Sequence, residues 1–256
     1  MELINISNLD LDFLKIKFIK KPFNYIIIDN FLVEEFAEKI LKEFPDISND
    51  WVDARGLHTQ NKWTQPIVDK GLAETLYEEI HSEEFRSFLS KLTGVDNLLA
   101  DESLNGAGFH QTTDGGFLDV HVDFNRHHDD STLDRRLNIL IYFNKDWHED
   151  NGGYLELWDM NVKERIEAVA PKFNRCVIFE TNEVSYHGHP VPVKLKGGGS
   201  RKSISSYYYT RGRSDVQAET HNTLYVNTQA GRGKLKIMAN GVRHFIRKVA
   251  KKLRNK

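Results

Sequence analysis

The sequence predicts a mostly β domain with flanking α-helices, in which the strands form a sandwich or a barrel such as a jelly roll. Two observations lead to this class. The chain after residue 100 holds several short β-branched or aromatic runs bounded by polar or glycine-rich segments, as in sandwiches and barrels. The first hundred residues instead carry helical periodicity, so we expect those helices to pack outside the β core.

The first hundred residues predict one strand and two or three helices. Residues 22–32, PFNYIIIDNFL, indicate a short strand followed by a turn. In residues 33–45 the side chains of Phe36, Ile40, Leu41 and Phe44 share one helical face, and a proline ends the run. Residues 73–94 predict one or two further helices, which end at the terminal glycine.

Four later runs are the expected strands of the β core. They are LNILIYF (137–143), GYLELW (153–158), RCVIFE (175–180) and SISSYYYT (203–210). Each is rich in β-branched or aromatic residues, and segments such as NKDWHEDNGG and VKLKGGGS separate them.

Composition excludes several classes of protein. With 39% hydrophobic and 28% charged residues, the chain has the composition of a globular protein. No run approaches the roughly 18 apolar residues that a membrane span needs. The single cysteine, Cys176, excludes an intrachain disulfide and any multi-cysteine metal site. Because the N-terminus is acidic and lacks a continuous apolar core, we expect no export and a cytoplasmic location.

The charge is unevenly distributed along the chain. Residues 220–256 contain ten basic residues and no acidic one, whereas residues 1–219 hold 25 basic and 37 acidic residues, a net charge of −12. We therefore divide the chain into a domain, 1–219, and a basic extension, 220–256. Within the domain we expect N-terminal helices to about residue 100 and a jelly-roll core over about 101–211.

The extension predicts an amphipathic helix, whose apolar face would consist of Val242, Phe245, Ile246, Val249, Ala250 and Leu253. This helix could dock on the domain, contact an anionic membrane surface or nucleic acid, or bind a partner protein. The acidic domain itself argues against a nucleic-acid groove.

Residues 118–124, LDVHVDF, alternate strictly between apolar and polar side chains. In a strand, His121 and Asp123 would project from one face, side by side. Sixty-four residues after Asp123, His187 follows the apolar run RCVIFE. Two histidines and one carboxylate can form the facial triad of non-haem Fe(II) oxygenases. The alternative is a hydrogen-bonded His–Asp pair on a solvent face.

Arg201 opens the strand SISSYYYT and suits bidentate recognition of a carboxylate, such as the one that 2-oxoglutarate would present. Taken alone, an arginine is more often a surface cation. The order HxD, then His, then Arg-x-Ser, with each member on or beside an expected strand, is much less frequent by chance.

These segments resemble the 2-oxoglutarate/Fe(II)-dependent dioxygenases of the prolyl-hydroxylase type, and within them the prolyl 4-hydroxylase-like branch of bacteria and viruses. The matching stretches run in the family's order from about residue 106 to 211: GFLDVHVDFN, LNILIYFNKDW, NGGYLELWD, VAPKFNRCVIFE, SYHGHPVPV and RKSISSYYYT. The resemblance implies a double-stranded β-helix, the distorted jelly roll that cupins also have. It does not cover the basic extension.

Carried over by position, the resemblance implies site residues and cofactors. Fe(II) would be held by His121, Asp123 and His187, and the distal carboxylate of 2-oxoglutarate would pair with Arg201. Tyr142 and Ser203 would assist Arg201, while O2 is the oxidant and ascorbate a candidate additional cofactor.

Three positions stay open at this point. His189 lies two residues beyond His187 and would replace it if the strand shifted. His110 precedes the HxD motif and would either line the pocket or pack in the core. The charged run RHHDDSTLDRR, residues 126–136, is expected to be a solvated loop at the mouth of the site, with contact to the substrate as the alternative.

The expected reaction is hydroxylation of a peptidyl proline with decarboxylation of 2-oxoglutarate to succinate and CO2, and it rests on the resemblance alone. The alternatives are the same chemistry on a sugar, a lipid or a free amino acid, demethylation of nucleic acid, and a non-catalytic cupin-like module that binds a metal or another ligand.

Overall fold

The computed structural model describes residues 3–5, 10–67, 71–101, 103–104, 106–213 and 219–228. The amphipathic helix predicted around residues 242–253 lies outside these residues. Among the described residues, no helix has both the length and the apolar character that crossing a bilayer requires.

Helices precede most of the strands in the chain, as the sequence predicts. The helices are α1 (Leu11–Lys17), α2 (Glu34–Glu43), α3 (Leu72–His81) and α4 (Glu83–Thr93), with a short 3-10 turn at Glu149–Asn151. The strands are β1 (Tyr25–Ile28), β2 (Val52–Asp53), β3 (Thr59–Gln65), β4 (Leu99–Ala100), β5 (Gly108–Val122), β6 (Leu133–Tyr142), β7 (Leu155–Trp158), β8 (Arg165–Val169), β9 (Arg175–Glu180), β10 (His187–His189), β11 (Ser200–Arg211) and β12 (Leu224–Val226).

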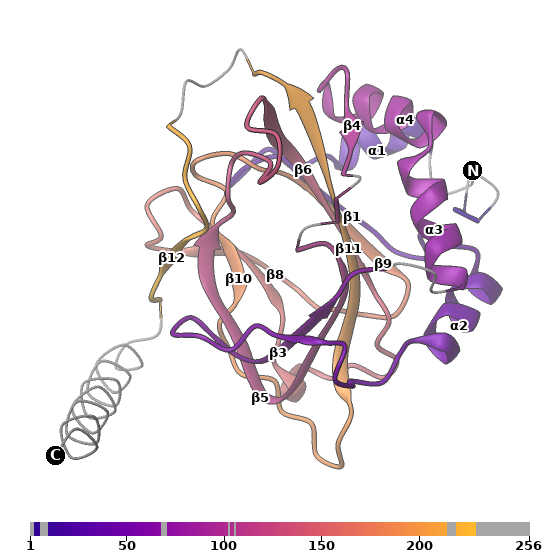
Figure 1. Ribbon diagram of the computed structural model, residues 1–256, viewed down its shortest axis with the longest axis vertical. Helices are drawn as coiled ribbons and strands as arrows, with labels where there is room; N and C mark the ends of the chain where they lie inside the picture. The colour runs from indigo at the N-terminus through magenta and orange to yellow at the C-terminus, as the bar shows by residue number, and fades with distance from the viewer. Residues whose placement is uncertain are drawn as a thin grey trace, which may run out of the picture.

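The strands form one antiparallel sheet that curls into a barrel-like body (Figure 1). Its order is β1-β9-β6-β11-β5-β10-β7-β8, and β3 and β12 also pair with β5. The long strand β5 joins the two halves: its first part pairs with β11 and its last part with β10. The mostly β class with helices outside is thereby confirmed.

A bend in β5 lets this strand serve both halves of the sheet. The pairing with β3 shifts register between Gln60 and Lys62, so that residues 113–116 of β5 have no partner in β3. A Cβ atom on Gly116 would lie 2.4 Å from Cγ2 of Thr112 and 2.7 Å from the carbonyl oxygen of Thr113. Only glycine therefore allows this tight bend.

Strand alternation sends successive apolar residues to two different cores. On β6 and β9, Ile139, Ile141, Cys176 and Ile178 face the helices. Their neighbours Tyr142, Val177 and Phe179 face the inside of the barrel, together with Leu155 and Leu157 of β7. Because both faces of these strands are buried, their sequences read as continuous apolar runs.

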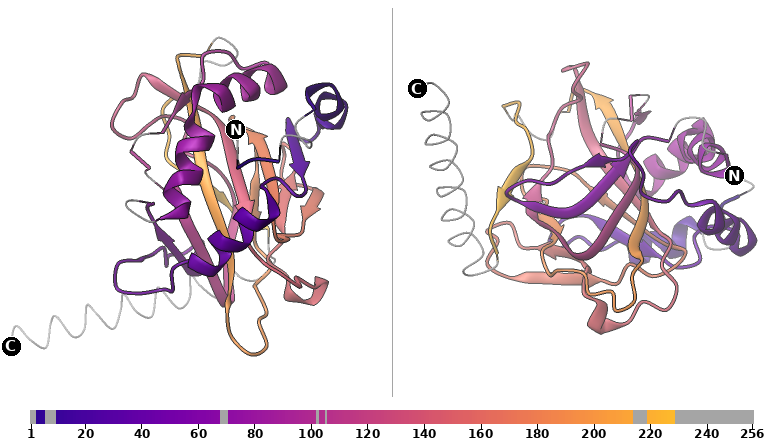
Figure 2. Two further views of the ribbon diagram at one scale, coloured as in Figure 1. Left: turned by 90° about the vertical axis from the view of Figure 1, so that its right-hand side faces the viewer. Right: turned by 60° about the horizontal axis from the view of Figure 1, so that its bottom comes forward.

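The helices α2, α3 and α4 lie together on one side of the sheet (Figure 2). The side chain of Ser82 caps α4 by accepting from the backbone NH of Phe85, and Gly94 ends the helix with φ of 76°. Their buried faces, which include Ile40 and Leu89, pack on the outer face of β1, β9, β6 and β11. This arrangement leaves the inner face of the sheet for the site.

Residues at both ends of the described chain add to the sheet. Strand β1, from the predicted N-terminal helical region, extends one edge by pairing with β9. Strand β12, from the predicted basic extension, pairs with the end of β5, so that Tyr225 lies opposite His121. The first part of the extension is thus placed beside the HxD motif.

Candidate metal centre and its cavity

His121, Asp123 and His187 meet at the end of β5. His121 lies on β5 and Asp123 directly follows that strand, so strand periodicity projects both side chains from one face. His187 begins β10 and lies directly opposite His121 in the β5–β10 pair. The exposed fractions of the two histidines are 5% and 6%.

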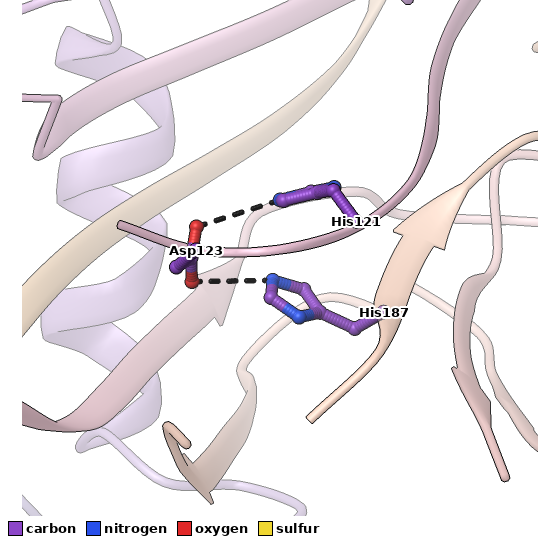
Figure 3. A group of neighbouring side chains, drawn as sticks. All are labelled: His121, Asp123 and His187. Carbon is purple, nitrogen blue, oxygen red and sulfur yellow. Dashed lines mark ion pairs between the residues drawn. The ribbon is translucent and has the colours of Figure 1, made fainter. Parts of the chain in front are cut away.

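The ligand atoms of these residues lie within 4.8 Å of one another. Nε2 of His121 is 3.4 Å from Oδ1 of Asp123, and Nε2 of His187 is 3.4 Å from Oδ2. Figure 3 shows both rings directed at the carboxylate. The group comes from two strands that are adjacent in the sheet but distant in the sequence.

Backbone carbonyls fix the orientation of both imidazole rings. Nδ1 of His121 is 2.9 Å from the carbonyl oxygen of Asp119, and Nδ1 of His187 is 2.9 Å from that of Ser185. A carbonyl only accepts, so each Nδ1 carries a hydrogen, and Nε2 is the nitrogen of each ring that faces Asp123. Burial also lowers the pKa of His187 to about 4, which favours its neutral form. Two imidazoles and one carboxylate fit a divalent iron ion.

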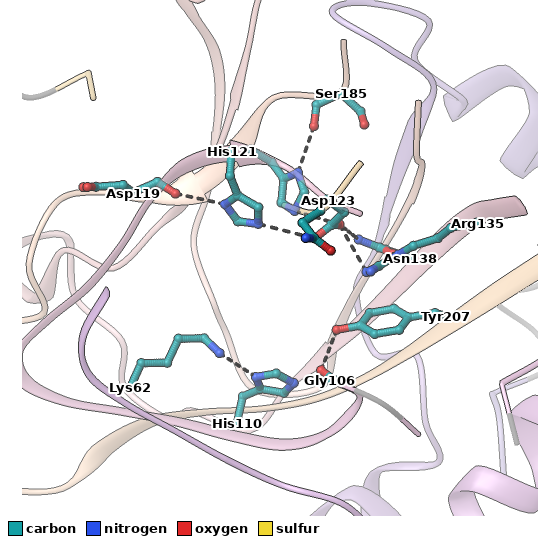
Figure 4. A network of polar contacts seen from close by, with 12 residues as sticks. Lys62, Gly106, His110, Asp119, His121, Asp123, Arg135, Asn138, Ser185 and Tyr207 are labelled. Carbon is teal, nitrogen blue, oxygen red and sulfur yellow. Dashed lines mark hydrogen bonds and ion pairs between the residues drawn. The ribbon is translucent and has the colours of Figure 1, made fainter. Parts of the chain in front are cut away.

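Asp123 is held as an anion by side chains that the sequence did not predict. Asn138 donates to Oδ2 of Asp123 at 2.7 Å, and Nη2 of Arg135 lies 3.1 Å from the same oxygen (Figure 4). Burial alone would raise the pKa of Asp123, but Arg135 and the two histidines outweigh it and hold this pKa well below its ordinary value.

Arg135 corrects the prediction that residues 126–136 form a solvated loop. His128, Asp129, Ser131 and Thr132 are exposed, but Arg135 belongs to β6 and is only 1% exposed. Its guanidinium lies 3.5 Å from the centre of the Tyr207 ring and donates twice to Oδ1 of Asn138. The sequence did not predict the burial of Arg135, because it lies in a charge-rich run and a single buried arginine produces no hydrophobic periodicity.

Arg201 lies at the other end of the same cavity. Its Nε donates to the carbonyl oxygen of Gly153 at 2.7 Å, and its Nη2 lies 3.4 Å from the Tyr142 hydroxyl. No carboxylate of the described residues pairs with this guanidinium, which is 5% exposed, and burial lowers its pKa. A buried cation without an anionic partner fits a bound carboxylate.

The residues expected to assist Arg201 lie on neighbouring strands. Ser203 faces the cavity and is paired in register with Tyr142 of β6 and His110 of β5. Tyr142 is fully buried, and its hydroxyl group contacts Arg201, which lines the cavity. All three predicted anchor residues therefore lie at one end of the site.

His189 and His110 both line the cavity but lie outside the metal group. A register shift separates His189 from His187, since His187 is paired with His121 and His189 with Leu118. Both ring nitrogens of His189 are buried and have no hydrogen-bond partner among the described residues. His110 forms polar contacts with Ser205 and Lys62. The strand register, which places His187 rather than His189 opposite His121, favours His187 as the metal ligand.

The cavity has a volume of about 320 Å³ and runs from the metal group to Arg201. Two lining residues carried no signal in the sequence, Lys62 on β3 and Tyr225 on β12. The Tyr225 ring stacks on His58 with centroids 4.5 Å apart and lies 5.4 Å from the His121 ring. Only the pairing of β3 and β12 with β5 brings these side chains to the site.

Comparisons with known proteins agree with this geometry. Residues 107–209 match the sequence model of the 2OG-Fe(II) oxygenase superfamily. Two curated relatives are described as prolyl 3-hydroxylase OGFOD1. The protein from Mus musculus is 28% identical over 198 residues, and the one from Xenopus laevis is 26% identical over 198 residues. Each alignment covers 73% of this chain but only 33% and 35% of the relative, so the chain spans about a third of their length.

Solved structures share the fold. A prolyl-4-hydroxylase from Pseudomonas putida superposes with a TM-score of 0.55 at 18% identity, covering 73% of this chain and 92% of that one. A prolyl hydroxylase from Trichoplax adhaerens, in complex with a peptide fragment of hypoxia inducible factor, gives 0.55 at 19% identity, covering 80% and 89%. The predicted double-stranded β-helix is confirmed.

Proposed function

Because residues 107–209 match the sequence model of the 2OG-Fe(II) oxygenase superfamily, we propose that this chain is an Fe(II)- and 2-oxoglutarate-dependent dioxygenase that hydroxylates a peptidyl proline. One observation carries the proposal. A His-Asp-His group and a buried arginine that pairs with no carboxylate of the described residues line the same cavity. A module that only binds metal has no need of the second feature.

His121, Asp123 and His187 would hold Fe(II), and Arg201 would bind the distal carboxylate of 2-oxoglutarate. When bound, iron, 2-oxoglutarate and O2 supply the oxidation, which yields succinate and CO2 and places a hydroxyl group on the substrate.

The protein's own contribution is position and environment. The carbonyl oxygens of Asp119 and Ser185 hold the two imidazoles in the tautomer that binds a metal. Arg135 and Asn138 orient Asp123 and keep it ionised. At the other end, Tyr142 and the Gly153 carbonyl fix the guanidinium of Arg201 before any ligand arrives. Such preorganisation lowers the cost of binding.

The substrate part of the proposal draws on the relatives. The curated relatives and both superposed structures carry the name prolyl hydroxylase. Thr64 on β3, Thr223 directly before β12 and Tyr225 on β12 are among the residues that line the cavity. A proline within a peptide is the substrate class that this support favours.

Anaerobic titration of the full chain with Fe(II) and 2-oxoglutarate tests the cofactor assignment. We expect a weak visible charge-transfer band in the wild type and none in Asp123→Ala. The exposed carboxylate of Asp129 gives a matched control, since Asp129→Ala should keep the band. No band in the wild type with metal bound would contradict the proposal.

Mass spectrometry of proline-containing peptides tests the substrate. Incubation with Fe(II), 2-oxoglutarate and O2 should add one oxygen atom to a proline and raise succinate production. Succinate production that responds to a sugar or a lipid, and never to these peptides, would replace the peptidyl substrate with that class.

A further inference from the structure

Lys62, Thr112 and Arg201 form a row across three neighbouring strands of the sheet. Lys62 on β3 is paired with Thr112 on β5, and Thr112 is paired with Arg201 on β11. Directly paired residues project from the same face of a sheet, and all three line the cavity. Neighbouring strands lie about 4.8 Å apart, and β5 separates β3 from β11. The backbones of Lys62 and Arg201 are therefore about 10 Å apart.

Lys62 lies across the cavity from the metal group (Figure 4). Its ammonium group is 2.9 Å from Nδ1 of His110, and Nε2 of His110 is 2.8 Å from Oγ of Ser205. An ammonium only donates, so His110 accepts at Nδ1 and donates from Nε2. The described residues give Lys62 no carboxylate in contact and no partner besides this neutral ring.

The cavity therefore holds more positive than negative charge. Lys62, Arg135 and Arg201 line it, while Asp123 is the one carboxylate among its described lining residues and is already paired with Arg135. Burial, with a smaller contribution from Arg201, lowers the pKa of Lys62 to about 8. A metal ion would add to this excess of positive charge. An anion bound between Lys62 and Arg201 would reduce it.

His189 adds an independent sign of a missing ligand. It is 3% exposed and reaches the cavity from β10, and within the described part of the chain neither ring nitrogen has a hydrogen-bond partner. Buried polar groups without partners are rare in folded proteins, because each costs free energy. A carboxylate in this part of the cavity would accept a hydrogen bond from the ring.

We propose that Lys62 is a second cation of the 2-oxoglutarate pocket, so that the dicarboxylate lies between Lys62 and Arg201. This inference rests on the proposed function and assigns a role to a residue of β3. In this arrangement Arg201 alone does not determine the affinity for the cosubstrate. Lys62 is a binding residue, since its ammonium group would contact the ligand.

Calorimetric titration of the Mn(II)-loaded full chain with 2-oxoglutarate tests the proposal without any turnover. We expect Lys62→Met to weaken binding of 2-oxoglutarate about tenfold or more, as loss of a charge-assisted hydrogen bond does. Binding of Mn(II) itself should be kept. Lys62→Arg should stay within about threefold of the wild type, because the positive charge remains.

Lys202→Met is the matched control, because Lys202 is next to Arg201 but points toward Phe44 on the helix side. It should leave the affinity for 2-oxoglutarate unchanged. Affinity of Lys62→Met within twofold of the wild type would overturn the role of Lys62 and leave the proposed function standing. Absence of 2-oxoglutarate binding in the metal-loaded wild type would overturn both.

Discussion

Asn138 donates a hydrogen bond of 2.7 Å to Oδ2 of Asp123, although the two residues belong to different strand regions of the barrel. The same amide accepts two hydrogen bonds from Arg135, whose guanidinium also reaches Asp123. The carboxylate expected to bind the metal is therefore fixed by two polar side chains before a metal arrives.

Asn138→Ala should weaken metal binding about 10- to 100-fold, as loss of a group that orients a ligand commonly does. The change removes the donor to Asp123 and the acceptor for Arg135 together. Titration with Mn(II) would measure it, with exposed Thr132→Ala as the control. Wild-type affinity in Asn138→Ala would show that Arg135 alone suffices to orient the carboxylate.

Arg201→Ala should weaken binding of 2-oxoglutarate by about 100-fold or more while Mn(II) still binds, because a buried anion would lose its charged partner. Arg211 is the matched control: it lies on the same strand but is 69% exposed at its side chain and contacts Asp130. An unchanged dissociation constant for 2-oxoglutarate in Arg201→Ala would place the anchor elsewhere.

Binding of 2-oxoglutarate should weaken as pH rises above 8. Burial lowers the pKa of Lys62 to about 8, so Lys62 is charged below that pH and increasingly neutral above it. An anion binds the charged form, and the affinity should fall by up to about tenfold per pH unit. Calorimetry between pH 7 and pH 9.5 would follow this loss.

Four other titratable side chains in or beside the cavity do not account for such a loss. Burial lowers the pKa values of His110 and His189 and raises those of Tyr142 and Tyr207, so each keeps one protonation state in this range. Arg201 is common to the wild type and Lys62→Arg. A loss of the same size in Lys62→Arg would therefore exclude Lys62 as its source.

Gly153→Ala should destabilise the fold by about 1–3 kcal/mol and displace Arg201. Gly153 has φ of 62°, and a Cβ atom there would lie 2.8 Å from Cγ2 of Val193 and 3.2 Å from Cδ of Arg201. Thermal unfolding and 2-oxoglutarate titration would measure the two effects.

Gly198→Ala separates backbone strain from steric contact, because φ is 92° there but no atom of the described residues lies within 4 Å of the added Cβ. It should lower the melting temperature without changing the affinity for 2-oxoglutarate. If both variants bind 2-oxoglutarate as the wild type does, Gly153 does not position Arg201.

The local pattern of side chains was enough to predict the strands β5, β6, β7, β9 and β11 and the order of the motifs. Alternation in LDVHVDF placed His121 and Asp123 on one face, and this holds in β5. The apolar runs of β6 and β9 identified buried strands. Such features depend on periods of two or 3.6 residues, which the sequence displays directly.

The supporting residues of the site could not be predicted in this way. Arg135 and Asn138 are three residues apart, so a regular strand would turn them to opposite faces. A register shift between Tyr208 and Tyr209 in the β6–β11 pair lets both reach Asp123. That shift depends on pairing between strands distant in the chain, and it leaves no local period in the sequence.

The sequence by itself thus predicted the strands β1, β5, β6, β7, β9 and β11, the common face of His121 and Asp123, and the family that the central segment resembles. Only the tertiary structure decided that His187 rather than His189 lies opposite His121, and that Lys62 and Tyr225 reach the cavity. The physical reason is that alternation along a strand is local, whereas register between strands is set by long-range hydrogen bonding and packing.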